Sequence, residues 1–417
     1  MAETHPPDAN RGAGKKRGKK SGNVADFRYK RPSQPKRAQS KRRKGNRANG
    51  GGGRTSNAAT RAPSIEKAQP TAHKAKQHNP NEAYAALDLG TNNCRLLIAR
   101  PSGKDFTVID AFSRVVKLGE DLATTGKLSD EAMDRAMSAL SVCADKLRRR
   151  KVRLARSVAT EACRRASNGE AFIERVKRET GIVLDIISAG EEARLAVLGC
   201  HILLEAGNGP AVIFDIGGGS TELVLLEPGG KVPRIIDWQS VPWGVVSLTD
   251  TVARNGDGRD ARLARYAKMR ELVSESFAPF AERIADAAAH PDIRLLGTSG
   301  TVTTLASLHL ELPHYDRKAV DGLIVPSTSM RDISADLAGM SAEKRSTLPC
   351  IGSDRADLVV AGCAILESIL DLWPAERLGV ADRGIREGIL RSLMASERQS
   401  ERSLKALEQL RSQKGEG

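Results

Sequence analysis

The stretch Val212-Ile-Phe-Asp-Ile-Gly-Gly-Gly-Ser-Thr-Glu-Leu-Val-Leu-Leu226 consists of two apolar runs on either side of a turn made of three glycines, a serine and a threonine. Apolar runs that flank such a turn predict a β-hairpin. Three consecutive glycines weaken a sheet, unless the backbone itself has to approach something closely. The turn is therefore a candidate binding loop, and a plain glycine hairpin is the alternative.

A second stretch, Ala85-Ala-Leu-Asp-Leu-Gly-Thr-Asn-Asn-Cys-Arg-Leu-Leu-Ile-Ala99, has the same plan. The two stretches align without a gap at an offset of 127 residues, so that Asp88 falls on Asp215 and Gly90 on Gly217. A self-similar segment of this kind indicates that one domain has been duplicated within the chain.

The chemistry of the two turns favours phosphate. Successive backbone N–H groups in a glycine-containing turn form a concave anion site, and hydroxyl and amide side chains add donors. An acidic residue beside it suits a divalent cation that bridges protein and phosphate. We predict a clamp of two loops whose phosphate-binding residues are Asp88, Gly90, Thr91, Asn92, Asn93, Gly217, Gly218, Gly219, Ser220 and Thr221. No GxxxxGK[ST] or GxGxxG spacing occurs here, which excludes a Walker loop and a dinucleotide fingerprint.

The segment between the hairpins alternates helical and extended patterns, which argues for α/β layers. We expect helices over 129–148 and 172–179, strands over 153–158 and 182–187, and a helix that starts at Glu191. Glu191 and Glu192 would lie in the first turn of that helix. One interpretation is that they complement the helix dipole, and the other is that one of them activates a water molecule.

Further glycine-rich turns follow in the second half. A strand over 293–296 leads into Gly297, Thr298, Ser299 and Gly300, and then into a helix whose free N–H groups suit a phosphate or a ribose. The same residues also fit a plain turn. Past an apolar helix over 358–370, the basic segment 382–388 precedes a closing helix that we expect to run through Met394.

The charge of the chain is unevenly distributed. Of its net charge of +15, residues 1–80 carry 21 Lys and Arg against 4 Asp and Glu, whereas the remainder carries 45 and 47. A basic segment with so little apolar surface is predicted to be disordered, and it suits either polyanion binding (polyphosphate, RNA or DNA) or solubility alone. No secretory signal and no run of 18 apolar residues occur, and the six cysteines form no CxxC pair. These observations favour a reduced, cytoplasmic location without a membrane.

Taken together, the motifs resemble the exopolyphosphatase / guanosine pentaphosphate phosphohydrolase family of the actin–Hsp70–sugar-kinase superfamily. The matching pieces occur in the family's order and cover about residues 83–395. They are Asp88-Leu-Gly-Thr-Asn-Asn93, Ala159-Thr-Glu-Ala-Cys-Arg164 with Asn168, Ile187-Ser-Ala-Gly-Glu-Glu-Ala-Arg-Leu195, Asp215-Ile-Gly-Gly-Gly-Ser-Thr-Glu222, Gly297-Thr-Ser-Gly-Thr301, Asp354-Arg-Ala-Asp357 and Arg386-Glu-Gly388.

The resemblance implies an α/β fold with two RNase H-like (actin-like ATPase) domains and a cleft between them, beside the disordered basic tail. We expect the tail over 1–82, domain I over 83–208, domain II over 209–395 with a closing helix able to pack on domain I, and a polar C-terminal tail over 396–417. The additional C-terminal helical domains of longer family members are not expected. Those domains can contribute to binding long polymers, so the sequence does not predict whether hydrolysis is processive. The resemblance is also compatible with a homodimer.

The resemblance also implies the roles of individual residues. Glu192 would be the general base that orients the attacking water, and Arg164 would hold phosphate oxygens. Asp215 and Glu222 would position Mg²⁺ and water. The family usually has Ser or Thr in place of Asn93, so the role of this donor differs from the pattern. The implied reaction is Mg²⁺-dependent release of the terminal phosphate from polyphosphate or guanosine pentaphosphate. Two alternatives stay open: a kinase or ATPase of the same superfamily, and a non-catalytic sensor of polyphosphate or alarmone.

Overall fold

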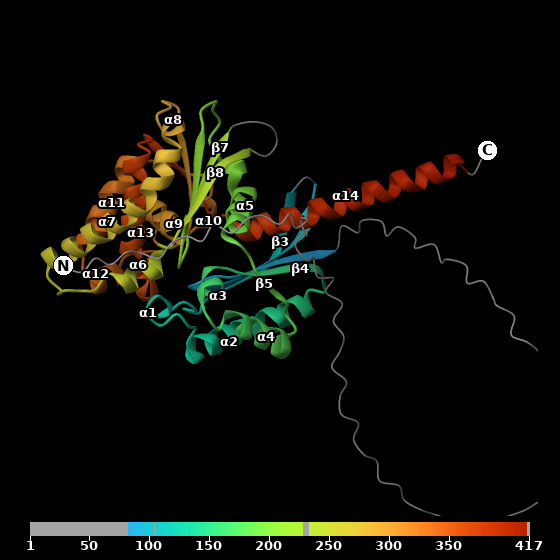
Figure 1. Cartoon of the computed structure of the whole chain (residues 1–417), viewed down its shortest axis with the longest axis horizontal. Coiled ribbons are helices and arrows are strands. Elements are labelled where there is room, and N and C mark those ends of the chain that lie inside the picture. The colour runs from blue at the N-terminus through green and yellow to red at the C-terminus, as the bar shows by residue number, and fades with distance from the viewer. Residues whose placement is uncertain (1–81, 104, 228–232, 415–417) are drawn as a thin grey trace, which may run out of the picture.

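Two β-sheets organise the part of the chain that the structure, a computed structural model, describes: residues 82–103, 105–227 and 233–414 (Figure 1). The predicted N-terminal tail lies outside these residues except for Glu82. None of the helices in the described ranges has the length and apolar content needed to cross a membrane.

The first sheet has five strands in the order β3-β2-β1-β4-β5. Its strands are β1 (Ala83–Leu89), β2 (Asn93–Ser102), β3 (Asp105–Val115), β4 (Val152–Ala159) and β5 (Leu184–Ile186). The predicted hairpin is confirmed, because β1 pairs antiparallel with β2 and places Asp88 opposite Arg95. On its other side β1 pairs parallel with β4, as a strand–helix–strand connection requires.

One face of this sheet is covered by α2 (Asp130–Arg149) and α4 (Gly169–Thr180), which share an apolar cluster with it. The helix expected over 129–148 is confirmed as α2, and it is capped at its start because the Ser129 hydroxyl accepts a hydrogen bond from the N–H of Ala132. The short helices α1 (Leu122–Thr125) and α3 (Glu161–Arg165) lie in the connections on either side of α2 and β4.

The second sheet repeats the plan of the first, in the order β10-β11-β9-β6-β7-β8. Its strands are β6 (Ala211–Ile216), β7 (Thr221–Glu227), β8 (Arg234–Val241), β9 (Arg294–Thr298), β10 (Ile324–Pro326) and β11 (Arg377–Ala381). The run β8-β7-β6-β9-β11 corresponds to β3-β2-β1-β4-β5, and β10 adds an antiparallel edge strand. Asp215 faces Glu222 at the register position where Asp88 faces Arg95. The pairing supports the duplication predicted from the offset of 127 residues.

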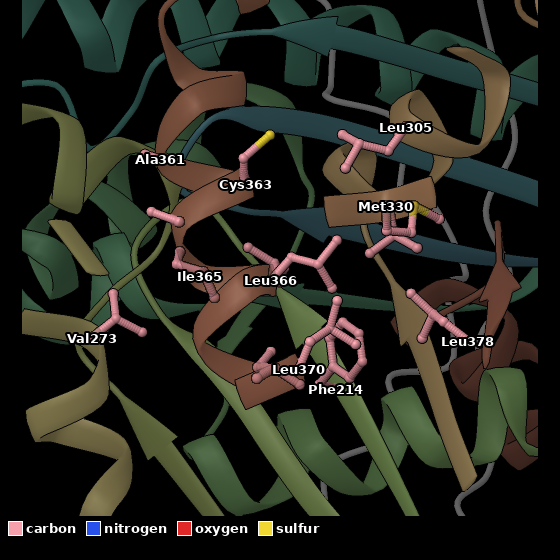
Figure 2. Packing of buried hydrophobic residues seen from close by; sticks show 14 of the residues in the cluster. Phe214, Val273, Leu305, Met330, Ala361, Cys363, Ile365, Leu366, Leu370 and Leu378 are labelled. Carbon is pink, nitrogen blue, oxygen red and sulfur yellow. The ribbon is translucent and has the colours of Figure 1, made fainter. Parts of the chain in front are cut away.

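The larger core lies on the helical side of the second sheet. Figure 2 shows Ile365, Leu366 and Leu370 of the central helix α13 packing toward Phe214 of β6. Trp373, which follows α13, is fully buried and meets Phe280 edge-on at a centroid distance of 5.7 Å. The helices of this half are α6 (Val245–Thr251), α7 (Arg259–Arg283), α8 (Ala285–Ala288), α9 (Gly300–His309), α10 (Arg317–Val320), α11 (Ser327–Gly339), α12 (Ala342–Ser346) and α13 (Leu358–Leu372).

Two helices, α5 (Ala189–Cys200) and α14 (Ile385–Lys414), lie between the sheets (Figure 1). Ala193 and Val197 of α5 pack on the second sheet, whereas Leu195 joins a cluster with β1 and with the first turns of α14. The two helices touch backbone to backbone: a Cβ on Gly388 would lie 2.0 Å from the carbonyl oxygen of Leu195. Glycine is therefore required at this crossing.

Two expected boundaries were wrong. Helix α14 does not end near Met394 but continues to Lys414, so that 396–414 of the expected polar tail is helical. Its later turns are polar, and an apolar stripe is not needed for a helix to continue from a well-packed first half. Helix α5 begins at Ala189, because the hydroxyl of Ser188 caps the N–H of Glu191. All six cysteines are free, and five of them are buried.

Candidate active site

Both glycine loops open into one cavity of about 140 Å³ between the two sheets. Gly90 and Gly218 lie on this shared cavity together with Glu192, as the clamp hypothesis requires. The predicted residues that line it are Asp88, Gly90, Thr91, Asn92, Asn93, Glu192, Asp215, Gly217, Gly218, Gly219, Ser220, Glu222, Ser299 and Gly300.

The two loops are anchored by their carbonyl groups. The carbonyl of Asn92 accepts hydrogen bonds from the N–H groups of Val116 and Lys117, and the carbonyl of Gly218 accepts from those of Val246 and Ser247 at the start of α6. No hydrogen bond within the described ranges uses the backbone N–H of Thr91, Asn92, Gly218, Gly219 or Ser220. A loop whose carbonyls are satisfied and whose N–H groups are not is an anion site.

The glycines of the second loop are required by contact with the first. A Cβ on Gly218 would lie 2.9 Å from Cβ of Thr91, and a Cβ on Gly219 would lie 2.8 Å from its hydroxyl oxygen. Any larger residue would push the loops apart. The three glycines that looked costly within a hairpin therefore let two backbones converge on one small cavity.

Glu192 lies at the cavity on the first turn of α5, with 6% of its surface exposed. Burial, followed by the negative charge of Glu222, raises the pKa of Glu192 well above its ordinary value, against the effect of Arg164. A carboxylate that holds protons more tightly than usual is a better base near neutral pH.

Glu191 faces away from the cavity. Its carboxylate accepts hydrogen bonds from Arg156 at 2.8 Å and from Arg194 at 2.7 Å. Although burial opposes the shift, these two partners hold the pKa of Glu191 below its ordinary value. The two members of the acidic pair thus differ in their surroundings: Glu191 is held in ion pairs, and Glu192 faces the cavity.

Arg164 lies behind Glu192 and does not line the cavity. Its Nη1 donates to Oε2 of Glu192 at 3.0 Å and to the carbonyl of Ile187 at 2.8 Å, and its other side is paired with Glu161. This arrangement orients the carboxylate of Glu192 and balances part of its charge.

Three further predicted residues lie off the main cavity. Thr221 is fully buried and its hydroxyl donates to the carbonyl of Trp243. Thr298 donates to the carbonyl of Arg383, and a Cβ on Gly297 would meet the ring of Phe214 at 2.6 Å. These residues hold strands β7 and β9 in place, because the period of a strand turns alternate side chains into the core. The sequence motifs contain both side chains that face the cavity and side chains that face the core, and the sequence alone does not distinguish the two.

Five carboxylates line the cavity: Asp88, Glu161, Glu192, Asp215 and Glu222. Burial raises the pKa of Asp215 to about 8, and the charge of Glu222 adds to this effect. Burial also raises the pKa values of Asp88 and of Glu222, although Ser220 and Ser240 donate hydrogen bonds to Oε1 of Glu222 at 2.7 and 2.9 Å. Several buried carboxylates close together lower the stability of the folded protein when they are ionised, unless a bound cation compensates their charge.

The donor set fits Mg²⁺. Carboxylate oxygens are the ligands that this ion prefers, and it usually takes one or two of them together with water and substrate phosphate. In the parts of the chain that the structure describes, no three His, Cys, Asp or Glu side chains are grouped as a protein-only metal cage. The oxygen Oδ1 of Asn92 is buried in this wall without a hydrogen-bond partner.

A second cavity of about 580 Å³ adjoins the first, and the two share Asp88, Arg95, Asp215, Ser299, Gly300, Arg355 and Ile385. It is lined by four arginines, and we name it the arginine cavity: Arg95, Arg355, Arg383 and Arg386. Arg383 is paired with Asp321 at 2.7 Å. The guanidinium groups of Arg95, Arg355 and Arg386 form no hydrogen bond or ion pair with any described residue.

The arginine cavity was not predicted as a site. Arg355 and Arg386 belong to sequence motifs for which no role was predicted, and Arg95 occupies the position in β2 that corresponds to Glu222 in β7. Burial, reinforced by Arg95, lowers the pKa of Arg386 against the attraction of Glu387. A half-buried guanidinium without a partner requires an anion, so this cavity is suited to negatively charged groups.

Comparisons with known proteins agree with this chemistry. A family model described as the Ppx/GppA phosphatase family matches residues 97–397. Exopolyphosphatase 2 of Mycobacterium tuberculosis is 29% identical over 322 residues, which are 74% of this chain and 98% of that protein. A guanosine-5'-triphosphate,3'-diphosphate pyrophosphatase of Aeromonas salmonicida is 27% identical over 323 residues, covering 76% of this chain and 60% of that protein.

Among solved structures, the Ppx/GppA family member of Aquifex aeolicus superimposes with a TM-score of 0.62 at 29% identity, covering 76% of this chain and 98% of that one. The two-domain, actin-like α/β fold expected from the motifs is confirmed, as is the family resemblance on which it rested.

Proposed function

Because the chain belongs to the Ppx/GppA phosphatase family, we propose that it releases the terminal phosphate of inorganic polyphosphate or of guanosine pentaphosphate by attack of water, with Mg²⁺ as cofactor. One observation carries the proposal. Two loops with unused backbone N–H groups meet across a small cavity whose wall also holds the carboxylate of Glu192.

The terminal phosphoryl group would lie between the two loops. The N–H groups of Thr91 and Asn92 would hold its oxygens from one side, and those of Gly218 and Gly219 from the other. Phosphoryl transfer needs little covalent help from a protein, so that alignment and charge stabilisation account for most of the rate. Pre-oriented N–H groups supply both without reorganising during the reaction.

Glu192 would accept a proton from the attacking water. Burial and the charge of Glu222 raise its pKa, which strengthens it as a base, and its hydrogen bond from Arg164 keeps one oxygen fixed while the other stays available. We assign Arg164 to positioning Glu192, in place of the direct phosphate contact expected from the family resemblance.

Asp215 and Glu222 would hold Mg²⁺ through one or two oxygens. When bound, the ion neutralises charge on phosphate oxygens. The fit rests on the crowded carboxylates: burial raises the pKa values of Asp215 and Glu222, and the charges of neighbouring carboxylates add to the shift, so a bound cation would be favoured here.

The arginine cavity would hold the part of the substrate beyond the cleaved bond. Phosphates further along a polyphosphate chain, or the 3'-diphosphate of the nucleotide, would pair with Arg95, Arg355 and Arg386. Of the aromatic residues in the described ranges, Tyr315 alone lines this cavity, which offers little surface for stacking a guanine. We therefore favour polyphosphate as the main substrate.

The test is phosphate release from purified protein with polyphosphate and with guanosine pentaphosphate, each in Mg²⁺. We expect turnover of both and a higher kcat/KM for polyphosphate. Label found on an acceptor molecule would instead support a kinase. Tight binding of polyphosphate without any release would support a sensor. A cytoplasmic location, binding of polyanions by residues 1–81 and a homodimer remain predictions from the sequence.

A further inference from the structure

Strand β8 presents two different faces. Asp237 and Gln239 bond to helix α7 on one side of the second sheet. Because successive side chains of a strand alternate, Trp238 and Ser240 point to the other side, where α5 lies. This face of β8 thus looks across from the second sheet toward the helix that carries Glu192.

Each residue on that face contacts an element that carries an active-site carboxylate. The hydroxyl of Ser240 donates to Oε1 of Glu222 at 2.9 Å. The indole of Trp238 packs on Gly190, the second residue of α5, such that a Cβ there would lie 2.9, 3.3 and 3.5 Å from three ring carbons. Gly190 lies two residues before Glu192, within the same helical turn.

We propose that Trp238 is a positioning residue for hydrolysis: its ring, held by β8, sets the first turn of α5 and thereby the place of Glu192 opposite Glu222. The inference rests on the proposed function, in which Glu192 orients the attacking water. It adds a contact from the second domain to a residue that belongs to the first.

The exposure of Trp238 argues against a purely structural role. The side chain is 41% exposed, whereas the large apolar residues that build the cores are almost fully buried. An indole of this exposure on an edge strand contributes less to stability than a core residue does. Its covered side lies against Gly190, where the absence of a side chain lets the ring touch the helix backbone.

Trp238→Ala should therefore affect the rate more than the fold. Without the ring, the first turn of α5 loses the packing contact that fixes its position. A displacement of about 1 Å of a catalytic group lowers a rate about a hundredfold. We expect kcat for polyphosphate to fall between about tenfold and a hundredfold, with KM within about threefold of the parent value, because the loops and the arginine cavity are untouched. Trp238→Phe, which keeps a ring at the contact, should restore most of kcat.

A pair of size changes tests the contact itself. Gly190→Ala places a methyl group against the ring and should lower kcat by about tenfold or more. In the double variant Gly190→Ala/Trp238→Ala the methyl group has room, and alanine is a better helix former than glycine. The double variant should therefore turn over no more slowly than Trp238→Ala alone. Ile236→Ala removes another exposed apolar side chain of β8, 47% exposed, and serves as the matched control.

Rates are taken per folded molecule, with the folded fraction measured by circular dichroism. If Trp238→Ala retains kcat within twofold of the parent, or if the effects of Gly190→Ala and Trp238→Ala simply multiply, the proposal is overturned. Glu192→Gln in the same assay distinguishes failure of the proposed function from failure of the role of Trp238. An active Glu192→Gln variant would refute the proposed function itself. An inactive Glu192→Gln variant together with a normal Trp238→Ala variant would refute only the role of Trp238.

Discussion

Asp215→Asn should make the protein more stable and inactive at once. The carboxyl group of Asp215 faces the crowded wall of the cavity, where burial and then Glu222 raise its pKa to about 8 from an ordinary 3.8. Asparagine has nearly the same shape and resembles the protonated acid, so that the substitution removes the cost of ionising this group in the fold.

The sign follows from proton linkage. The folded state binds this proton more tightly than the unfolded chain does, so ionisation of the unfolded chain lowers stability as pH rises from about 4 toward about 8. At 1.36 kcal/mol for each pKa unit, the cost is about 4 kcal/mol at pH 7 and about 1.5 kcal/mol at pH 5. Both figures are upper limits, because Asp215 is half-buried and water in the cavity solvates it.

The assay is urea unfolding, followed by circular dichroism in a buffer with EDTA, at pH 5 and at pH 7. We expect the free energy of unfolding of Asp215→Asn to exceed that of the parent by up to these amounts, and by more at pH 7 than at pH 5. Adding Mg²⁺ should stabilise the parent and have a smaller effect on the variant, because the ion would lose a ligand.

Asp286→Asn is the matched control, since Asp286 is exposed on α8 and its substitution should change stability by less than about 0.5 kcal/mol. A variant that is no more stable than the parent at pH 7, or that shows the same difference at both pH values, would refute the reasoning.

The other predictions are simpler to test. Glu192→Gln should lower kcat about 10²- to 10⁴-fold while polyphosphate still binds, and Glu191→Gln, which loses only ion pairs away from the cavity, should stay within a few-fold of the parent. Arg386→Gln should raise KM for long polyphosphate more than for tripolyphosphate, with Arg100→Gln on the exposed side of β2 as control; equal effects on both substrates would contradict the arginine cavity as a chain-binding site. Deleting residues 1–81 should make polyphosphate affinity less dependent on salt, because fewer counterions are released; an unchanged slope of affinity against salt would reject a binding role for the tail.

Much of the fold was readable from the sequence, since its signals are local. The two glycine hairpins, the helix capped by Ser129 and the strands that flank it follow from apolar patterns and turn residues. The continuation of α14 to Lys414 did not follow, because its later turns lack the apolar periodicity on which the boundary was based. The first half of α14 is well packed, and the helix continues from it into residues 396–414, whose polar sequence resembles that of a tail.

The sequence predicted the residues of the site only where a recognisable motif supplies residues that line the cavity. Glu192, Asp215 and the glycines of both loops lie where expected, because sharp turns at strand ends must face the cleft. Arg95 and Arg386 were not predicted to line a cavity, since a lone arginine in a strand or at a helix start is usually a surface residue. They are distinguished only in three dimensions, where their guanidinium groups line a cavity without a hydrogen bond or ion pair to a described residue.

The duplication accounts for how one cleft would hold an anion and, as we propose, also activate water. Each repeat supplies a hairpin with a loop of unused N–H groups and an aspartate seven residues before a partner across the strands. In the first repeat that partner is Arg95, and in the second it is Glu222. The exchange of one charge between equivalent positions adds an arginine that lines both cavities and a glutamate that lines only the first, so that the side of the cleft toward Arg383 and Arg386 is the more positive and the side around Glu192 the more negative. A phosphate chain bound from the first side would present its end to the second, where a cation and a basic carboxylate are both needed. Two copies with identical partners would lack this polarity: two arginines would leave no place for Mg²⁺, and two glutamates would repel the chain.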